Sequence, residues 1–316
     1  MRVLITNIAS VTGISITKIL KNGEINNLEI LGTEAQKYGY NSGSLLVDKY
    51  IQVPEISDLN YVKTIIDICR EWKVDILIPI LDEELYLFSK AKIQNYVKIL
   101  LPSIDTINLF RDKLAANIKL SLIYPEIIPP IYKNINELRD DKAIIRKRKS
   151  IGSQGVIIKE KTEITYEDFK NQSYFVQKYV KGDEYTVDIL ADRNGVVRLI
   201  VPRKRLQIKN GVSTKVILKN DREIVDLCKN IYNQFCIPGL SNVQLIRSNS
   251  RLYFIELNMR FAGMGIAGIL GSYDYISKYI LYLNEGKNLG CFSENMKQVR
   301  WNSVICRYYE ETILMQ

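Results

Sequence analysis

The chain has 316 residues, of which 47% are hydrophobic and 25% are charged, so it can form about two domains of ordinary soluble composition. It contains no histidine, which excludes a catalytic triad, a histidine general base and any histidine-ligated metal. The formal net charge of +9 favours anionic partners, although an AT-rich genome also raises the lysine content.

The five cysteines, Cys69, Cys228, Cys236, Cys291 and Cys306, are scattered without paired spacing. Their spacing argues against a disulfide framework and a zinc site, and it favours a reducing environment. No apolar run reaches the length of a membrane span, and the N-terminal sequence begins like a strand rather than a signal peptide. We therefore expect a cytoplasmic protein without a membrane partner.

Strand and helix patterns alternate over residues 1–105. Amphipathic helix patterns follow the first strand and cover residues 60–72. Apolar strand patterns lie at residues 2–6, 28–33, 50–54 and 74–79. This alternation predicts a parallel sheet with helices on both faces, which is a Rossmann-like α/β domain. The first strand-to-helix turn has Gly13 as its only glycine, so it lacks the G-x-G-x-x-G fingerprint and no dinucleotide is expected there.

Three consecutive acids, Asp82, Glu83 and Glu84, follow the strand at 74–79. Functional side chains in such sheets gather beyond the carboxyl ends of the strands. One of the three, with Glu83 as the candidate, is therefore expected to face a substrate. The alternative is that these acids only complement the dipole at the start of a helix.

A domain boundary is expected near residues 102–105, where a proline and a serine interrupt the pattern. The next apolar residues, Ile107, Phe110, Leu114 and Ile118, have helical spacing and predict one helix that also carries Asp112 and Lys113.

Residues 143–158 have the pattern of strand, loop and strand. Four consecutive cations, Arg146 to Lys149, lead into a loop at 150–155 that holds two glycines and two serines. Glycines let backbone amides approach phosphate oxygens, and the cations neutralise them. The segment is therefore a candidate phosphate loop, although no G-K-[ST] opens a helix as in a P-loop. The alternative is a tight hairpin with a basic rim.

Residues 174–190 have the pattern of a strand, a turn at Gly182 and a second strand. An extended backbone beside a flat ligand can offer N–H and C=O groups to a purine, and a carboxylate such as Glu184 can accept ribose hydroxyls. The alternative is a plain hairpin. A further basic patch, Arg203 to Arg205, follows this segment.

A polar array lies in the last pair of strand patterns. Glu256 and Asn258 are two residues apart and so share one face of a strand. If Ser248 to Ser250 form a three-residue hairpin loop, Gln244 pairs with Phe254 and falls on the same face.

A carboxylate and two amide oxygens converging on one face suit a hard cation such as Mg²⁺ or Mn²⁺ that keeps nucleotide phosphates as its other ligands. Arg260 follows directly and can grip an anion bidentately. The alternative is a surface hairpin with polar residues on its solvated face.

Four features occur in an order that resembles the ATP-grasp superfamily. They are the basic strand with its Gly/Ser loop, the Glu184 segment, the basic patch and the Glu256-to-Arg260 array. The branch it resembles is that of the carbamoyl-phosphate-synthase large chain and the carboxylate–amine ligases. The resemblance covers essentially the whole chain. It implies an α/β fold with a parallel-sheet preATP-grasp domain at 1–105 and an ATP-grasp domain at 106–316. The latter would comprise two α+β subdomains, of which the smaller, a lid, covers about 115–180.

The resemblance also implies site residues. The metal positions are Gln244, Glu256 and Asn258. Catalytic positions are Arg260, which matches an arginine that stabilises the phosphorylated intermediate, together with Arg146 and Asn258. The matches to ATP-binding positions are Lys113, Arg146 or Lys147, Arg148, Gly152, Ser153, Gly155, Gln177, Lys178, Val180 and Glu184. Among these, Lys113 would contact phosphate, the backbone of Val180 would contact adenine and Glu184 would contact ribose.

In the resembled family, a carboxylate attacks the γ-phosphate of Mg-ATP to give an acyl phosphate and ADP, and an amine then displaces phosphate. The expected function is an ADP-forming ligase for small-molecule carboxylate and amine substrates. The alternatives are carbamoyl-phosphate-type chemistry on bicarbonate or carbamate, which would need two such units, and a non-catalytic nucleotide-binding module. Substrate contacts are expected from Glu83, Arg203, Arg205 and the loop at 262–265. No nucleic-acid partner is expected, because the basic residues are dispersed, and a homodimer is common among relatives.

Overall fold

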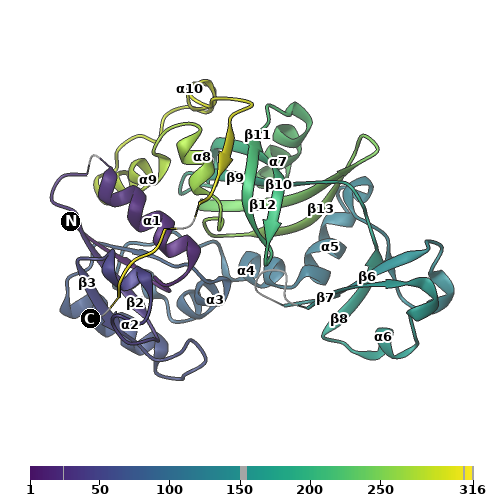
Figure 1. Cartoon of the computed structure of the whole chain (residues 1–316), viewed down its shortest axis with the longest axis horizontal. Helices are drawn as coiled ribbons and strands as arrows, with labels where there is room; N and C mark the ends of the chain where they lie inside the picture. The colour runs from purple at the N-terminus through teal and green to yellow at the C-terminus, as the bar shows by residue number, and fades with distance from the viewer. Residues whose placement is uncertain (24, 150–154, 309, 315–316) are drawn as a thin grey trace.

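The computed structural model describes the chain except for residues 24, 150–154, 309 and 315–316. The described residues form three β-sheets. Figure 1 shows the N-terminal sheet with its helices at lower left, a small teal sheet at right, and a large green sheet between and above them. The predicted α/β fold, with an N-terminal parallel sheet ahead of antiparallel sheets, is confirmed.

The N-terminal sheet is parallel, with the strand order β3-β2-β1-β4. Its strands are β1 (Arg2–Ile5), β2 (Glu29–Glu34), β3 (Lys49–Gln52) and β4 (Ile76–Ile78). Helices α1 (Val11–Asn22), α2 (Tyr61–Glu71) and α3 (Asp82–Lys90) pack around it. Apart from the edge strand β3, these strands are nearly continuous buried apolar runs, as expected of a parallel sheet that is covered on both faces.

The predicted single helix after residue 105 is two helices, α4 (Ile104–Arg111) and α5 (Lys113–Ser121). Asp112 separates them with an extended backbone, φ −100° and ψ 102°. Its side chain accepts the backbone N–H groups of Leu114 and Ala115 and so caps α5. The prediction of one continuous helix is wrong, because apolar spacing does not register a capping residue that starts a new helix.

The small sheet is antiparallel, with the order β5-β8-β6-β7. Its strands are β5 (Ile131–Tyr132), β6 (Lys142–Lys147), β7 (Val156–Glu160) and β8 (Tyr174–Lys178), accompanied by the short helix α6 (Glu167–Lys170). Ala143, Ile145 and Val176 form the centre of its apolar core. The predicted domain boundary at residue 105 and the predicted limits of the lid subdomain, about residues 115 and 180, stay predictions.

The large sheet is antiparallel, with the order β13-β12-β9-β10-β11-β14. Its strands are β9 (Asp183–Ala191), β10 (Val197–Lys209), β11 (Val212–Leu218), β12 (Gly239–Ser248), β13 (Arg251–Asn258) and β14 (Val304–Cys306). Because β8 and β9 belong to different sheets, the hairpin reading of residues 174–190 is wrong. The linker between these two strands joins the two sheets.

The two faces of the large sheet are covered differently. On one face, Val187, Ile189 and Val243 pack against α7 (Arg222–Gln234). On the other face, Leu190 and Leu199 pack near α9 (Tyr275–Glu285) at one end of the sheet. The remaining helices are α8 (Ile266–Leu270) and α10 (Phe292–Lys297). Further along this second face lie polar side chains, among them Gln244 and Glu256. None of the described helices combines the length and the apolar character that a membrane span requires.

The turn between β12 and β13 differs from the predicted three-residue loop. Ser248 pairs with Arg251, so the loop contains only Asn249 and Ser250. Both loop residues have positive φ, 46° and 65°, as a type I′ hairpin turn requires.

Candidate functional site

The uncovered part of the second face of the large sheet carries polar side chains from neighbouring strands. A β-bulge between Gln244 and Leu245 places Gln244 directly opposite Glu256, rather than opposite Phe254 as the three-residue loop implied. Directly opposed residues of antiparallel strands share a face, and Asn258 lies two residues further along the same strand. The structure therefore brings together all three predicted metal-binding residues despite the error in register.

Glu256 is a half-buried carboxylate among cations. Its Oε2 lies 3.4 Å from Nζ of Lys113, and its Oε1 accepts a hydrogen bond of 3.1 Å from Nδ2 of Asn258. Burial by itself raises the pKa of Glu256, but Lys113 and Arg146 outweigh this effect and hold that pKa below its usual value. Glu256 is therefore ionised at neutral pH.

The side-chain amide of Asn258 is oriented by its neighbours. Its Nδ2 donates to Glu256 and, over 3.2 Å, to Oδ1 of Asn242, which leaves Oδ1 of Asn258 as an acceptor. Asn242 is buried and donates to the carbonyl oxygen of Arg260. The sequence analysis missed Asn242, although it lies two residues before Gln244 on the same face of β12 and could have been found by that alternation.

These side chains fit a hard cation that binds together with a phosphate. Within the described ranges, no three His, Cys, Asp or Glu side chains cluster in a way that could hold a metal ion. Gln244, Glu256 and Asn258 offer one carboxylate and two amide oxygens, which is too few for the six oxygen ligands of Mg²⁺. A cation at this position must take its remaining ligands from a second molecule and from water.

A cavity of about 300 Å³, the first cavity, lies between the small sheet and the large sheet. The predicted site residues on its wall are Lys113, Arg146, Gln177, Lys178, Val180, Glu184, Arg205, Gln244 and Glu256. Apolar side chains such as Ile144, Ile158 and Ile246 line the same cavity. An apolar slot with charged groups at one side suits a flat ring that carries an anionic tail.

Arg146, rather than Lys147, faces the first cavity. Its Nη1 donates to Oε1 of Gln177 over 3.2 Å, and its Nη2 donates to the carbonyl oxygen of Ile255 over 2.9 Å. Ile255 is the extra residue of the β-bulge, so its carbonyl lies outside the regular ladder. Arg146 thereby ties the small sheet to the large sheet beside Glu256. Lys147 lies on the opposite face of β6 and lines a different cavity.

Arg148 lies just beyond the end of β6 at Lys147 and, unlike Arg146, lines neither cavity. Its guanidinium binds the carboxylate of Asp112 through Nε and Nη2. Gly152 and Ser153 of the candidate phosphate loop lie outside the described residues. Gly155 has a φ of +77°, a conformation that glycine adopts without strain.

The linker side chains at the end of β8 are bound within the protein. Gln177 is 1% exposed, and its Nε2 donates to Oδ1 of Asn117 and to the carbonyl oxygen of Pro129. Lys178 forms an ion pair of 2.6 Å with Asp140. Both side chains are bound to other residues of the protein. A ligand in the first cavity would therefore contact the backbone of this linker rather than these side chains.

Three carboxylates of the region from α5 to β8 have lowered pKa values. Burial raises the pKa of Asp112, Asp140 and Asp168, but their partners Arg148, Lys178 and Lys159 outweigh it. Because the folded-state pKa lies below the unfolded value of about 3.9, these carboxylates stabilise the fold at higher pH, and the stabilisation is lost as pH falls through the folded-state pKa.

We expect the melting temperature of the protein to be constant from pH 7 to 5 and to decrease when the pH is lowered below about 4. Circular dichroism would measure it. The triple variant D112N/D140N/D168N is expected to melt lower at pH 7 and to lose less on acidification. An equal loss in both proteins would contradict this assignment.

Arg205 forms an ion pair with Glu184, the candidate ribose-binding carboxylate. Its Nη1 donates to Glu184 over 2.9 Å, its Nε to Ser213 over 2.9 Å and its Nη2 to the carbonyl oxygen of Gly211 over 2.6 Å. These contacts fix the β10–β11 turn beside Glu184 at the first cavity. The prediction that Arg205 contacts a substrate other than the nucleotide is not supported by this geometry.

Replacing Arg205 by methionine is expected to raise the KM for ATP about tenfold with little change in kcat, because charge-assisted hydrogen bonds of this kind contribute about 1.5–3 kcal/mol. Steady-state kinetics with varied ATP would measure it. Arg198→Met is the matched control, since Arg198 lies on the same strand and pairs with Asp192 outside both cavities. A tenfold change in both variants, or in neither, would contradict the role of Arg205.

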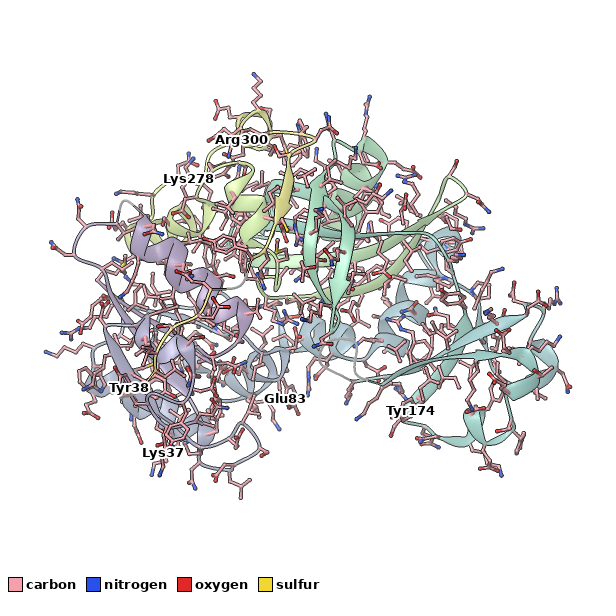
Figure 2. The ribbon with its side chains drawn as sticks, viewed as in Figure 1. Lys37, Tyr38, Glu83, Tyr174, Lys278 and Arg300 are labelled. Carbon is pink, nitrogen blue, oxygen red and sulfur yellow. The ribbon has the colours of Figure 1, made fainter. Side chains whose placement is uncertain are left out.

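A second cavity, of about 420 Å³, lies beyond Lys113 and is bounded by the N-terminal domain, the small sheet and β13. Glu83 from α3 and Tyr174 from β8, both labelled in Figure 2, lie on its two sides. Asn258 lines it as well, so the polar array borders both cavities. Glu83 is paired with Arg111, also on the wall.

Arg260 is held at the edge of the N-terminal domain. Its Nε donates to Oδ2 of Asp82 over 2.9 Å, and its Nη1 donates to the carbonyl oxygen of Phe261 over 3.2 Å. Asp82, rather than Glu83, therefore connects the N-terminal domain with the polar array. Arg203 is 1% exposed, lines neither cavity and binds Asp188 instead.

The loop at 262–265 is packed inside the protein, because Ala262 and Met264 are buried and line neither cavity. Its expected contact with a substrate is not supported.

Two family models match the chain. Residues 3–110 match the model described as "PylC-like, N-terminal domain", and residues 170–299 match the model described as "ATP-grasp in the biosynthetic pathway with Ter operon". A D-alanine–D-alanine ligase of Fusobacterium nucleatum is 25% identical over 142 residues, which are 41% of this chain and 50% of the ligase. The match thus spans half the length of that relative.

Solved structures share the fold across nearly the whole chain. The biotin carboxylase domain of Hydrogenobacter thermophilus 2-oxoglutarate carboxylase, in complex with MgADP, ADP and bicarbonate, has a TM-score of 0.72 at 13% identity and covers 96% of this chain and 73% of that one. N5-carboxyaminoimidazole synthetase from Staphylococcus aureus gives 0.69 at 16% identity, with 92% and 78% covered. L-amino acid ligase from Bacillus licheniformis gives 0.65 at 12% identity, with 90% and 74% covered.

The fold and the two family models agree with the resemblance seen in the sequence. The parallel N-terminal sheet falls within the first matched range, and the large sheet with its polar array falls within the second. The resemblance of the chain to the ATP-grasp superfamily is thus confirmed, by an ATP-grasp model over residues 170–299 and a PylC-like N-terminal model over residues 3–110.

Proposed function

We propose that this protein is an enzyme of the ligase class that uses ATP and Mg²⁺ (or Mn²⁺). As its specific reaction, we propose that it converts a small carboxylate into an acyl phosphate, with release of ADP, and that an amine then attacks this acyl phosphate. One observation carries the proposal: the polar array of Gln244, Glu256 and Asn258 lies where the two cavities meet. A nucleotide in the first cavity would present its phosphates to a carboxylate in the second.

The charged side chains suit the meeting of two anions. Lys113 and Arg146 lie beside Glu256, and Arg260 follows four residues later in the chain. Fixed cations around the transferring phosphoryl group lower the cost of bringing a carboxylate to it. Mg²⁺, held by Gln244, Glu256 and Asn258, would neutralise phosphate charge when bound.

The reaction has two balanced steps. A carboxylate oxygen forms a bond to the γ-phosphorus while the bond from that phosphorus to the β,γ-bridging oxygen breaks, and ADP leaves. The amine nitrogen then bonds to the acyl carbon, phosphate leaves with the electron pair of the C–O bond, and the amine loses a proton. Arg146 and Arg260 would balance the charge that develops, and no histidine is needed.

The comparisons support the coarser assignment. The curated relative is named a D-alanine–D-alanine ligase, and the structural neighbours include an L-amino acid ligase and a carboxyaminoimidazole synthetase. A second candidate, phosphorylation of bicarbonate, is favoured by the biotin carboxylase neighbour whose structure contains MgADP and bicarbonate.

The test measures ADP, AMP and phosphate released from Mg-ATP with a panel of carboxylates and bicarbonate, with and without ammonia or an amino acid as the amine. ADP formation that requires a carboxylate and an amine supports the proposal, while ADP formation with bicarbonate alone supports the second candidate. AMP formation would contradict the acyl-phosphate mechanism. Binding of ATP without turnover on any of these substrates would favour the non-catalytic module.

The remaining expectations about partners stay predictions. A homodimer would be seen by light scattering, and the Hydrogenobacter thermophilus neighbour is described as a domain dimer. Nucleic-acid binding, which we do not expect, would show as affinity that falls steeply with salt.

A further inference from the structure

The acids of the second cavity are neutralised by the protein itself. Among the described residues of its wall, the carboxylates are those of Asp82 and Glu83. Asp82 is paired with Arg260 over 2.9 Å, and Glu83 is paired with Arg111. Neither carboxylate is therefore left to balance further cations on the same wall.

The lysines of the second cavity are not all balanced in this way. Lys113, Lys147 and Lys149 line it, and Lys113 forms an ion pair with Glu256. Lys147 and Lys149 form no ion pair with any residue that the structure describes. Neither of these two lysines lines the first cavity, in which the nucleotide is proposed to bind. The second cavity thus offers two positive charges that a ligand can neutralise.

The residue between these two lysines is anchored to the neighbouring helix junction. Arg148 binds the carboxylate of Asp112 through its guanidinium, and its carbonyl oxygen accepts the backbone N–H of Lys113 over 2.8 Å. These bonds hold the chain on both sides of Arg148 against the junction of α4 and α5. Lys147 and Lys149 therefore line the cavity from a segment that is fixed by their shared neighbour.

The stem of Lys147 is fixed as well. It lies across Gly155, where an added Cβ would come within 2.7 Å of the Cβ of Lys147. The backbone N–H of Lys147 also donates to the carbonyl oxygen of Gly155 over 2.8 Å. Tyr174, which is labelled in Figure 2, lies opposite Lys147 on β8 and lines the same cavity. The path of this lysine side chain is thus set by the backbone at the start of β7.

The second cavity has room for a substrate with two separate charged groups. Its volume is about 420 Å³, against about 300 Å³ for the first cavity. Leu85, Phe110 and Met259 line it and suit an apolar connecting chain. One anionic group would lie near Asn258, where the two cavities meet, and the other would lie at the two unpaired lysines.

We propose that the carboxylate substrate of this enzyme carries a second anionic group, a carboxylate or a phosphate, and that Lys147 and Lys149 bind this group in the second cavity. The inference rests on the proposed function and names the substrate class of that reaction. Both anions attract lysine ammonium groups in the same way. The two lysines thereby determine specificity, while the reacting carboxylate lies at the polar array.

The experiment compares carboxylates of matched length with one and with two anionic groups in the ADP-release assay, with ammonia present throughout. The pairs are butyrate and succinate, valerate and glutarate, 2-aminobutyrate and aspartate, and butyrate and 3-phosphonopropionate. The wild-type enzyme is expected to prefer the second member of at least one pair by about tenfold or more in kcat/KM, because hydrogen bonds to a charged group contribute about that factor. The last pair distinguishes a phosphate-type group from a carboxylate.

The double variant Lys147→Met/Lys149→Met is expected to abolish this preference without raising the KM for ATP. Lys147→Arg/Lys149→Arg retains both charges and is expected to retain the preference. Lys142→Met is the matched control, because Lys142 lies at the other end of β6, pairs with Glu160 and lines neither cavity. It is expected to keep the preference of the wild type.

Equal kcat/KM for both members of every pair that supports turnover would overturn this inference and leave the proposed ligase function intact. An unchanged preference in Lys147→Met/Lys149→Met would do the same, and a raised KM for ATP in that variant would then assign the lysines to the nucleotide phosphates. Absence of ADP formation with every carboxylate and with bicarbonate would instead overturn the proposed function, and this inference with it.

Discussion

Replacing Glu256 by alanine is expected to lower the rate of ADP formation by about a thousandfold or more, because the polar array then loses its only carboxylate. Gln244 and Asn258 would retain two neutral amide oxygens, which bind a divalent cation weakly without a charged ligand. The ion pair between Lys113 and this carboxylate would also be lost. The assay is the carboxylate-dependent release of ADP at saturating Mg-ATP.

Glu256→Gln separates charge from packing, since it keeps the size and one oxygen of the side chain. It is expected to lose nearly as much activity as Glu256→Ala, with a circular dichroism spectrum like that of the wild type. Glu71→Ala, an exposed carboxylate at the end of α2, is the matched control and should retain full activity. Activity within about tenfold of wild type in both Glu256 variants would exclude a metal-binding role for this residue.

Replacing Arg203 by methionine is expected to lower the free energy of unfolding by about 3–5 kcal/mol, because it leaves the Asp188 carboxylate buried without its partner. The two side chains are 1% and 4% exposed and form two hydrogen bonds of 2.6 Å. Arg203 has a further nitrogen, Nη1, that is buried without a hydrogen-bond partner among the described residues. The measurement is equilibrium unfolding in urea.

Lys204→Met provides the matched control for this prediction. Lys204 is the next residue and forms an ion pair of 2.7 Å with Asp183, whose side chain is 52% exposed. Its loss is expected to change the free energy of unfolding by less than about 1 kcal/mol. The double variant of Asp188→Leu and Arg203→Met is expected to recover much of the loss, since neither charge then remains buried. A loss of under about 1 kcal/mol in Arg203→Met alone would contradict the account.

The sequence predicted the N-terminal domain closely, because its elements are set by local patterns. The buried strands of a parallel sheet are continuous apolar runs, and α2 has strong helical spacing of its apolar residues. The prediction of one continuous helix was wrong at Asp112, because this single capping residue ends one helix and starts the next. Apolar spacing reports which face of a helix is buried and carries no information on where the chain changes direction.

The register of the last hairpin shows a second limit of the sequence. Positive φ at Asn249 and Ser250 shortens the loop by one residue, and the bulge at Ile255 shifts the pairing again. The two changes add up to a shift of two residues, from Phe254 to Glu256, so Gln244 still shares a face with Glu256. The face was predictable because side chains alternate along a strand, while the partner of each residue depends on turn geometry that composition alone did not reveal.

The sequence by itself determined the types of side chain that the chemistry needs: a carboxylate and amides at strand spacing, cations before a glycine loop, and no histidine. Only the tertiary structure decided which cations remain available to a ligand. Arg146 reaches the first cavity, while Arg148, Arg203 and Arg205 are each occupied by a carboxylate of the protein. It also brought Asp82 to Arg260, residues that are 178 positions apart. The physical reason is that strand spacing is a local property, whereas the neutralisation of a charge depends on which distant segment packs against it.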